Sequence, residues 1–310
     1  MVWRKFPLES SIGLLDTLLV MASSTSKRSE KKKNKKNPNP AQSWRTAETA
    51  DRHELYELSV QNVEGEVELV QQFFSDLGEG DCTRVREDFC GTGQFSAAWA
   101  KSDPTRSAVG VDLDTEVLGW GRDRLAERLD ESEQKRVELL EGDVLKVTGD
   151  PVDAVLATNF SYYLFKTRSE LKNYFATARK HIRPGGIFIM DAYGGSESFE
   201  EQEEERDLDG FVYVWDQNHY NPITGDVVNH IHFRFPDGTE LNKAFTYEWR
   251  LWTLPELQEL LLEAGFQSVN VYWEGTIEEG DEEGEGDGEF KQTKVGEACQ
   301  GWIAYLVAQP

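Results

Sequence analysis

Residues 87–93 read EDFCGTG, and this short stretch decides the fold expected for the chain. Residues 85–89 have the composition of a strand, and residues 92–101 have that of a helix. Gly91 and Gly93 lie in the turn between the two. Such a turn lets backbone N–H groups approach a ligand at the helix N-terminus. The stretch therefore predicts a βα unit with a nucleotide-type binding turn.

Strand and helix patterns alternate along much of the chain. Two helices are expected between residues 51 and 77, with a break near Gly65. Repeated βα units predict a parallel sheet with helices on both faces. We therefore expect an α/β fold with a doubly wound, mostly parallel seven-stranded sheet and an antiparallel C-terminal hairpin. Its further strands are predicted at 107–111, 137–140, 152–158, 187–191, 268–273 and 302–308, and its further helices at 115–129 and 169–182.

The pattern changes after the fifth strand. Three aromatic and β-branched runs follow, FVYVWDQNHY, VVNHIHFRF and KAFTYEWRLW, separated by the turn segments NPITGD and PDGTELN. They predict a three-stranded antiparallel β meander, inserted at 205–252 into a domain that spans 46–310. Next, Thr253 and Glu256 form a capping-box pattern that predicts a helix ended by Gly265.

Charge is distributed unevenly along the chain. The formal net charge is −24, yet residues 1–45 carry ten Lys/Arg against three acids. This arm is expected to be disordered, and its lysine-rich part, 27–36, leaves nuclear import or RNA contact open. The acidic body should repel phosphate backbones. The glycine-rich acidic segment 277–292 is expected to be a mobile loop.

Cysteine spacing and hydropathy indicate the cellular compartment expected for the protein. The three cysteines form no CxxC pair, which argues against a disulfide framework or a zinc site and favours a reducing compartment. No apolar run is long enough to span a membrane. We expect a soluble cytoplasmic protein, or a nuclear one through the lysine-rich arm, and no resident metal.

Two acids follow the second and third predicted strands. Asp112 ends the second strand in AVGVDLD, and Asp143 follows the third in EGDV. A carboxylate at the end of the second strand suits a ribose diol, and a polar residue after the third suits an adenine amino group. Both lie where open α/β sheets bind nucleotides.

The segments EDFCGTG, VGVDLD, EGDV, NFSYY and RPGGIFIMDAY follow one another in this order, over roughly residues 80–195. This series resembles the successive motifs of class I (Rossmann-like) S-adenosylmethionine-dependent methyltransferases. The resemblance implies an enzyme that uses S-adenosyl-L-methionine. It also implies a set of cofactor-binding positions in this chain, with Tyr56 of the preceding helix as a candidate lid contact: Glu87, Phe89, Cys90, Gly91, Gly93, Asp112, Leu113, Asp143, Val144 and Asn159.

Phe89 departs from this family pattern, which has glycine at its position. Either its backbone keeps a negative φ and its ring packs beneath the cofactor, or the turn is too altered to bind. The order of the later motifs favours the first alternative. The second motivates a further hypothesis, a catalytically silent scaffold with the methyltransferase fold.

The meander is expected to cover the strand C-termini and to line the acceptor pocket. Its aromatic residues have apolar faces and polar tips, although they could equally form the meander's own core. His219 is the candidate general base, and no other catalytic residue is indicated. His230 and His232 share a strand face but lack a third metal ligand. The candidate acceptor-binding residues are Tyr193, Trp215, His219, Tyr220, His232, Tyr247 and Trp249.

The sequence leaves several classes of methyl acceptor open. Residues 159–162, NFSY, lack both prolines of the Asn/Asp-Pro-Pro-Tyr motif of amino-methylating nucleic-acid enzymes. With the acidic body, this favours methyl transfer to an N, O or S atom of a small molecule, while RNA or a protein stays possible. A dehydrogenase is disfavoured because the glycine fingerprint ends in Ser96. The acceptor atom and the oligomeric state are left open.

Overall fold

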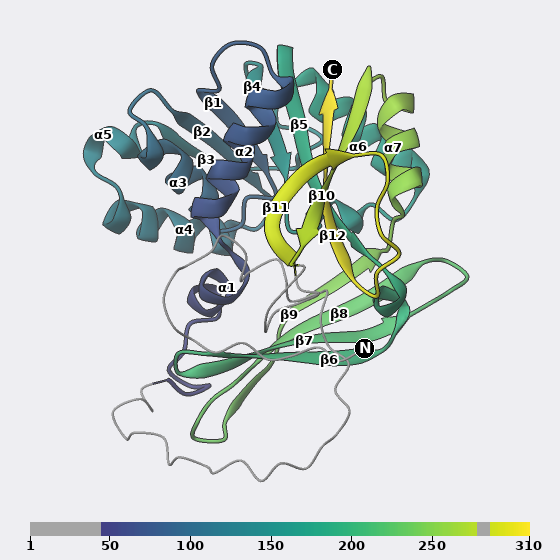
Figure 1. Ribbon diagram of the computed structural model, residues 1–310. Coiled ribbons are helices and arrows are strands. Elements are labelled where there is room, and N and C mark those ends of the chain that lie inside the picture. The colour runs from purple at the N-terminus through teal and green to yellow at the C-terminus, as the bar shows by residue number, and fades with distance from the viewer. Residues whose placement is uncertain (1–44, 278–285) are drawn as a thin grey trace.

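The computed structural model describes residues 45–277 and 286–310. The arm at 1–44, including its lysine-rich part, and residues 278–285 of the acidic segment lie outside the described residues. Two sheets organise the described part (Figure 1). The larger has eight strands in the order β11-β10-β12-β5-β4-β1-β2-β3, and the smaller has four in the order β6-β7-β8-β9.

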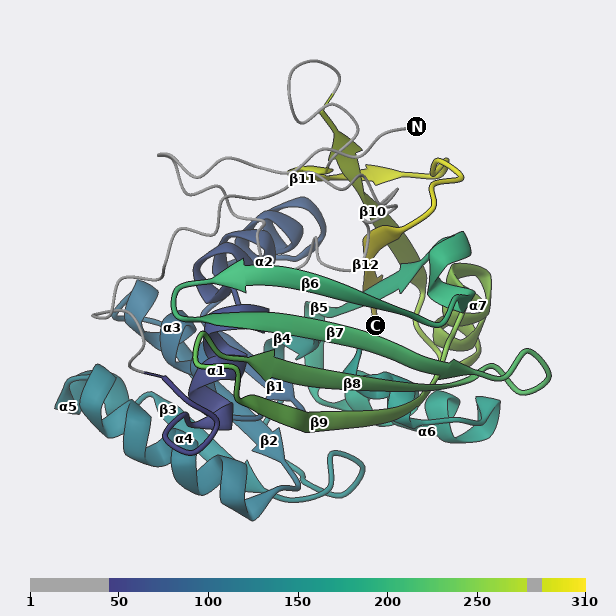
Figure 2. The ribbon, with the colours of Figure 1, turned by 90° about the horizontal axis from the view of Figure 1, so that it is seen from below.

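The larger sheet confirms the predicted α/β class. Strands β3, β2, β1, β4 and β5 pair in parallel, and β12 joins β5 antiparallel. Helix α2 lies on one face, and α6 and α7 lie on the other (Figures 1 and 2). The elements of this layer are β1 (Arg84–Asp88), α3 (Gln94–Ser102), β2 (Ser107–Asp112), α4 (Thr115–Arg128), α5 (Glu131–Gln134), β3 (Val137–Glu141), β4 (Val152–Ala157), η3 (Ser161–Leu164), α6 (Arg168–Lys180), β5 (Ile182–Gly194), α7 (Leu254–Glu263), β10 (Ser268–Thr276), β11 (Gly286–Thr293) and β12 (Trp302–Gln309).

Strand β11 corrects the expectation of a mobile loop through 292. It pairs antiparallel with β10 and adds an eighth strand to the sheet. Its acidic and glycine-rich composition suggested a loop, but Phe290 anchors it. That ring is buried against Tyr305, with ring centroids 4.9 Å apart, and Gln72 donates a 2.8 Å hydrogen bond to the Phe290 carbonyl.

The smaller sheet has four strands rather than the predicted three: β6 (Gln202–Leu208), β7 (Phe211–Tyr220), β8 (Asp226–Arg234) and β9 (Glu240–Arg250). Strand β6, QEEERDL, lacks the aromatic and β-branched residues of its neighbours, so composition did not predict it. It pairs with β7 from Gln202 to Leu208. We call these four strands the lid sheet.

Two helices precede the first strand, as predicted. Asp51 caps α1 (Arg52–Val60), and Asn62 caps α2 (Val63–Leu77), so the chain breaks at 61–62 and Gly65 lies inside α2. Thr253 and Glu256 form the predicted capping box of α7. None of the described helices is long and apolar enough to cross a membrane.

Helix α1 and the lid sheet lie at the same edge of the larger sheet (Figures 1 and 2). This is the edge where the parallel strands end, because the turn after β1 contacts α1 through Thr92 and Glu57. The fold therefore gathers the predicted motifs beneath the lid sheet.

Candidate functional site

The glycine turn has the left-handed backbone that its glycines predict. Gly91 has φ 54° and Gly93, which caps α3, has φ 72°. A Cβ on Gly93 would lie 2.6 Å from Leu139 Cδ2, whereas no atom lies within 4 Å of the corresponding position at Gly91. Gly93 is therefore required for packing, while Gly91 leaves open space beside the turn.

The backbone of Phe89 does not have the negative φ that was expected. Its φ is 62°, the left-handed conformation that a glycine would adopt. The half-buried ring packs against two aromatics, with centroids 5.4 Å from Tyr174 and 6.2 Å from Phe165. The turn thus keeps the backbone of a glycine loop, and aromatic packing holds the residue in a strained conformation.

Asp112 holds the turn in place. Its Oδ2 accepts a 2.8 Å hydrogen bond from the Gly91 N–H, and its Oδ1 accepts one of 2.9 Å from the Asp114 N–H. Each carboxylate oxygen can accept a further bond, so the group can still bind a diol. The next side chain, Leu113, is 71% exposed and offers an apolar surface for a flat ring.

Asp143 and Val144 lie after β3, as the resemblance implies. Asp143 accepts a 2.9 Å bond from the Leu145 N–H and pairs with Lys146 at 3.0 Å. These contacts hold the pKa of the partly exposed carboxyl below its ordinary value. Val144 is buried and forms part of the core.

A group of buried acids surrounds the turn. The Glu87 Oε2 accepts bonds from the Ser96 N–H at 3.1 Å and the Ser96 Oγ at 2.6 Å, which anchors the start of α3. Burial raises the pKa of Glu87 to about 8, and the nearby charge of Asp112 adds to this rise. Burial also raises the pKa of Glu66 in α2, with the charges of Glu87 and Asp191 in support. Cys90 is buried beside this group.

Asp191 positions the loop after β4. Its carboxylate accepts bonds from the N–H groups of Asn159 at 2.8 Å and Phe160 at 2.9 Å. Both of those residues have positive φ, 56° and 55°. Burial raises the pKa of Asp191 to about 7, and the two backbone N–H groups oppose the rise. Asn159 thereby faces the same strand edge as the glycine turn.

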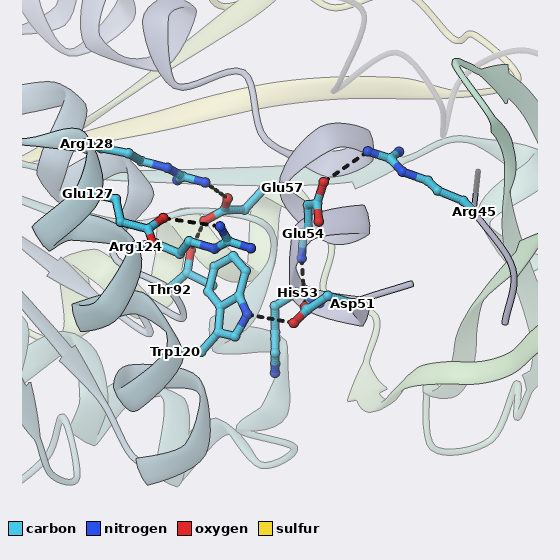
Figure 3. A network of polar contacts seen from close by, with 10 residues as sticks. All are labelled: Arg45, Asp51, His53, Glu54, Glu57, Thr92, Trp120, Arg124, Glu127 and Arg128. Atoms are coloured by element: carbon cyan, nitrogen blue, oxygen red, sulfur yellow. Dashed lines mark hydrogen bonds and ion pairs between the residues drawn. The ribbon is translucent and has the colours of Figure 1, made fainter. Parts of the chain in front are cut away.

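Helix α1 is latched to the glycine turn (Figure 3). The buried Glu57 accepts 2.7 Å hydrogen bonds from the Thr92 hydroxyl and from Arg128 of α4. At the other end of α1, Trp120 Nε1 donates a 2.8 Å bond to the capping Asp51. Helix α1 thus connects the glycine turn to α4, and Tyr56 lies on this helix.

The inner face of the lid sheet lies toward the strand edge. The side chains of Tyr56 and Tyr247 hydrogen-bond each other, and Trp249 lies over Tyr163 with centroids 6.0 Å apart. Tyr193, at the end of β5, lies beside Asn229. Register places the inner-face residues in two cross-strand rows, Glu204-Trp215-Ile231-Phe245 and Gln202-Gln217-Asn229-Tyr247.

Three of the candidate acceptor-binding residues lie elsewhere. His219 follows an irregularity in the β7–β8 register, is exposed, and contacts Glu201 through Nδ1 at 3.0 Å. His232 occupies the opposite sheet face, between Asp216 at 3.3 Å and the Lys243 N–H at 3.0 Å. Tyr220 lies at the end of β7 against the exposed Phe199. His219 is therefore exposed, and His232, although buried, lies on the face of the lid sheet that points away from the strand edge.

Sequence reasoning missed several buried acids: Glu66, Asp191, Glu197 and Glu204. Asp191 had a usable signal, because it ends the apolar strand predicted at 187–191, as Asp112 follows the one predicted at 107–111. Glu204 had none, since it lies among other acids in QEEERDL. No group of three His, Cys, Asp or Glu side chains in the described residues is arranged to hold a metal.

Comparisons with known proteins agree with this fold. Residues 90–188 match the family described as Methyltransferase domain. No curated protein sequence matches the chain. Among solved structures, an S-adenosylmethionine-dependent methyltransferase from Clostridium acetobutylicum is similar with a TM-score of 0.60 at 17% identity, over 83% of this chain and 97% of that one.

Two further structures are similar over most of their length. CalS10, an amino pentose methyltransferase from Micromonospora echinaspora involved in calicheamicin biosynthesis, has a TM-score of 0.56 at 17% identity, over 82% of this chain and 95% of that one. KedS8, a sugar N-methyltransferase from a Streptoalloteichus species, has a TM-score of 0.55 at 16% identity, over 84% and 94%.

The fold is a Rossmann-like α/β fold, and its glycine turn lies at the edge where the parallel strands end. With the family match, residues 90–188 are identified as a methyltransferase domain, and the chain has the fold of solved S-adenosylmethionine-dependent methyltransferases. The resemblance of the five motifs is thereby confirmed.

Proposed function

We propose that the chain transfers a methyl group from S-adenosylmethionine to a small-molecule acceptor bound between the lid sheet and the strand edge. The observation that carries this proposal is the position of the lid sheet's aromatic inner face, which contacts both α1 and the ends of the strands. It lies beside the turn where class I methyltransferases hold their cofactor.

The residues present fit this cofactor. Gly91 leaves open space next to Asp112, and exposed Leu113 adjoins the same carboxylate. The charges that act on Glu66 and Glu87 come from other acids. An unneutralised group of acids suits a ligand that carries a sulfonium and an ammonium group.

The chain's own residues would orient the reactants and exclude water. The bound cofactor supplies an electrophilic methyl group on its sulfonium. Asp112 would hold the ribose, Asp143 the adenine side, and Asn159 the methionine portion. Helix α1, latched by Glu57, would close the turn from water. Holding a nucleophile in line can supply roughly 7–11 kcal/mol of the barrier reduction.

A small-molecule acceptor agrees with the charge of the body and with the similar structures. The described domain carries a strong excess of acids, which disfavours a phosphate backbone. Two of the similar structures are an amino pentose methyltransferase and a sugar N-methyltransferase. These support a small acceptor, with nitrogen as the favoured atom.

The experiment is an untargeted transfer assay. The full chain is incubated with methyl-labelled S-adenosylmethionine and a metabolite extract, with and without ribonuclease. We expect label in a low-molecular-weight product that survives ribonuclease. Label that is lost with RNA digestion, or that remains on protein, would replace the small-molecule acceptor with RNA or a polypeptide.

A further inference from the structure

An unpaired carboxylate lies on the inner face of the lid sheet. Glu204 is only 5% exposed, and neither of its carboxylate oxygens has a hydrogen-bond partner among the described residues. A buried charge of this kind is costly unless a cation or a hydrogen-bond donor compensates it. Glu204 therefore points to a ligand that supplies such a donor.

A second acid lies near the first. Glu197, in the short helix η4 (Ser196–Phe199), is 4% exposed, and its Oε2 has no partner in the described part of the chain. Its charge acts on Glu204 and, together with burial, raises the pKa of Glu204 to about 8. These two adjacent buried acids form a negative centre only when they ionise, and a bound cation would favour that ionised form.

The basic residue of strand β6 has other contacts. Arg206, two residues beyond Glu204 on β6, donates to the Ser59 carbonyl and lies over the Tyr213 ring at 5.5 Å from its centroid. It makes no hydrogen bond to either Glu204 oxygen. The negative centre of Glu197 and Glu204 is therefore not paired with this arginine.

Unpaired donors lie beside Glu204. Trp215 is its direct cross-strand neighbour, is 2% exposed, and its Nε1–H has no partner among the described residues. Gln202, on the same strand face, has an unpaired buried Nε2. These donors do not bond to Glu204, so they are free to donate to acceptor atoms of a bound molecule, such as hydroxyl oxygens.

The aromatic side chains complete the surroundings. Trp215 lies 6.0 Å from Tyr247 and 6.4 Å from Trp249 between ring centroids. Aromatic faces attract cations as well as apolar surface. The same face therefore suits a ligand with a positive nitrogen, hydroxyl groups and a compact apolar frame.

We propose that the acceptor is a hydroxylated amine whose ammonium group binds Glu204 and Glu197, while Trp215 and Gln202 donate hydrogen bonds to its oxygens. The Glu204 carboxylate takes one proton from the ammonium group, and the neutral amine then forms the N–CH₃ bond as the S–CH₃ bond of the cofactor breaks and S-adenosylhomocysteine leaves. This inference rests on the proposed function and assigns the substrate class of the same site. It accounts for the unpaired polar atoms of Glu204, Glu197, Trp215 and Gln202.

The test pairs acceptors that differ in one group. Aminodeoxyhexoses with the amine at carbon 2, 3 or 4 are each assayed beside the hexose that has a hydroxyl at that carbon, with methyl-labelled S-adenosylmethionine. We expect label only in amine members. Glu204→Gln should raise the acceptor KM about 10- to 100-fold, the effect of one charge-assisted hydrogen bond, with unchanged S-adenosylhomocysteine affinity.

A stability measurement tests, without a substrate, whether the Glu204 carboxylate is unpaired. Glu204→Gln removes an unpaired buried charge, so above pH 8 it should raise the Tm of the cofactor-free protein by about 2–4 °C. The control is Asp207→Asn on the same strand, since Asp207 is exposed and its removal should leave the Tm unchanged. A fall in Tm for Glu204→Gln would show that the carboxylate has a partner within the protein and would overturn the proposal.

The two proposals fail in different ways. If the protein binds no S-adenosylhomocysteine, the proposed function fails. If methyl transfer proceeds to a neutral hexose and Glu204→Gln leaves its KM unchanged, the function stands and the amine inference is overturned.

Discussion

The backbone of Phe89 gives a prediction whose sign can be worked out from the structure. Phe89 has φ 62°, a conformation that costs a non-glycine residue about 1–2 kcal/mol. The packing of its ring on Tyr174 and Phe165 offsets part of this free-energy cost. Removing a half-buried ring should cost roughly 2–3 kcal/mol, about half to two thirds of the value for a fully buried phenylalanine.

Phe89→Ala and Phe89→Gly separate these two contributions. Both variants lose the ring, but only glycine also removes the backbone strain. We therefore expect Phe89→Gly to be more stable than Phe89→Ala by about 1–2 kcal/mol, although both are less stable than the wild type.

Urea unfolding at fixed pH, monitored by tryptophan fluorescence, measures the difference. Cys90, whose φ is not positive, is the matched control, and there alanine should be better than glycine by about 0.5–1 kcal/mol. If Phe89→Ala is more stable than Phe89→Gly, the left-handed backbone assigned to Phe89 is wrong.

Three further predictions concern the latch, the buried acids and the lid sheet. Glu57→Gln weakens the ion pair with Arg128 and should raise the S-adenosylhomocysteine dissociation rate about 10-fold in stopped-flow measurements, whereas Glu54→Gln, on the same helix, should not. The raised pKa of Glu87 means that the folded protein binds a proton that the unfolded chain releases, so its stabilising contribution, complete at acid pH, is lost as pH rises from about 5 through about 8. Glu87→Gln should remove this loss, so the unfolding free energy should fall less steeply with pH over that range, by up to about 1.4 kcal/mol per pH unit, and an unchanged slope would contradict the raised pKa. Trp215→Phe should raise the acceptor KM several-fold while S-adenosylhomocysteine affinity measured by calorimetry stays the same, and the reverse pattern would place the acceptor elsewhere.

The parallel sheet could be predicted because each βα unit carries its own local signals. Apolar strands, the glycine turn and the acids at strand ends appear in the sequence in their structural order. Asp112 is an example, since it ends β2 as predicted, and the structure adds its bond to the Gly91 N–H. Local periodicity and turn chemistry specify such units.

The lid sheet could be predicted only in part, because its faces depend on register. Trp215 and His232 seemed equivalent in sequence, yet register places them on opposite faces of the sheet. His219 lies beyond an irregularity in the same register and becomes exposed. A shift of one residue exchanges the two faces of a strand, so aromatic composition alone could not select the inner residues.

The remaining errors arose where tertiary contacts override composition. Phe89 adopts a left-handed backbone because aromatic neighbours hold its ring. Glu204 is buried by pairing with β7, although its strand is one of the most charged segments of the chain. Neither effect has a local signal in the sequence.

The most direct test of the central claim is isothermal titration of S-adenosylhomocysteine into the wild type and Asp112→Ala. We predict one site per wild-type chain and a loss of affinity of at least 30-fold in the variant, roughly the two hydrogen bonds of a ribose diol, with an unchanged far-UV circular dichroism spectrum. No binding to the wild type, or equal affinity in both proteins, would contradict the cofactor site at the glycine turn.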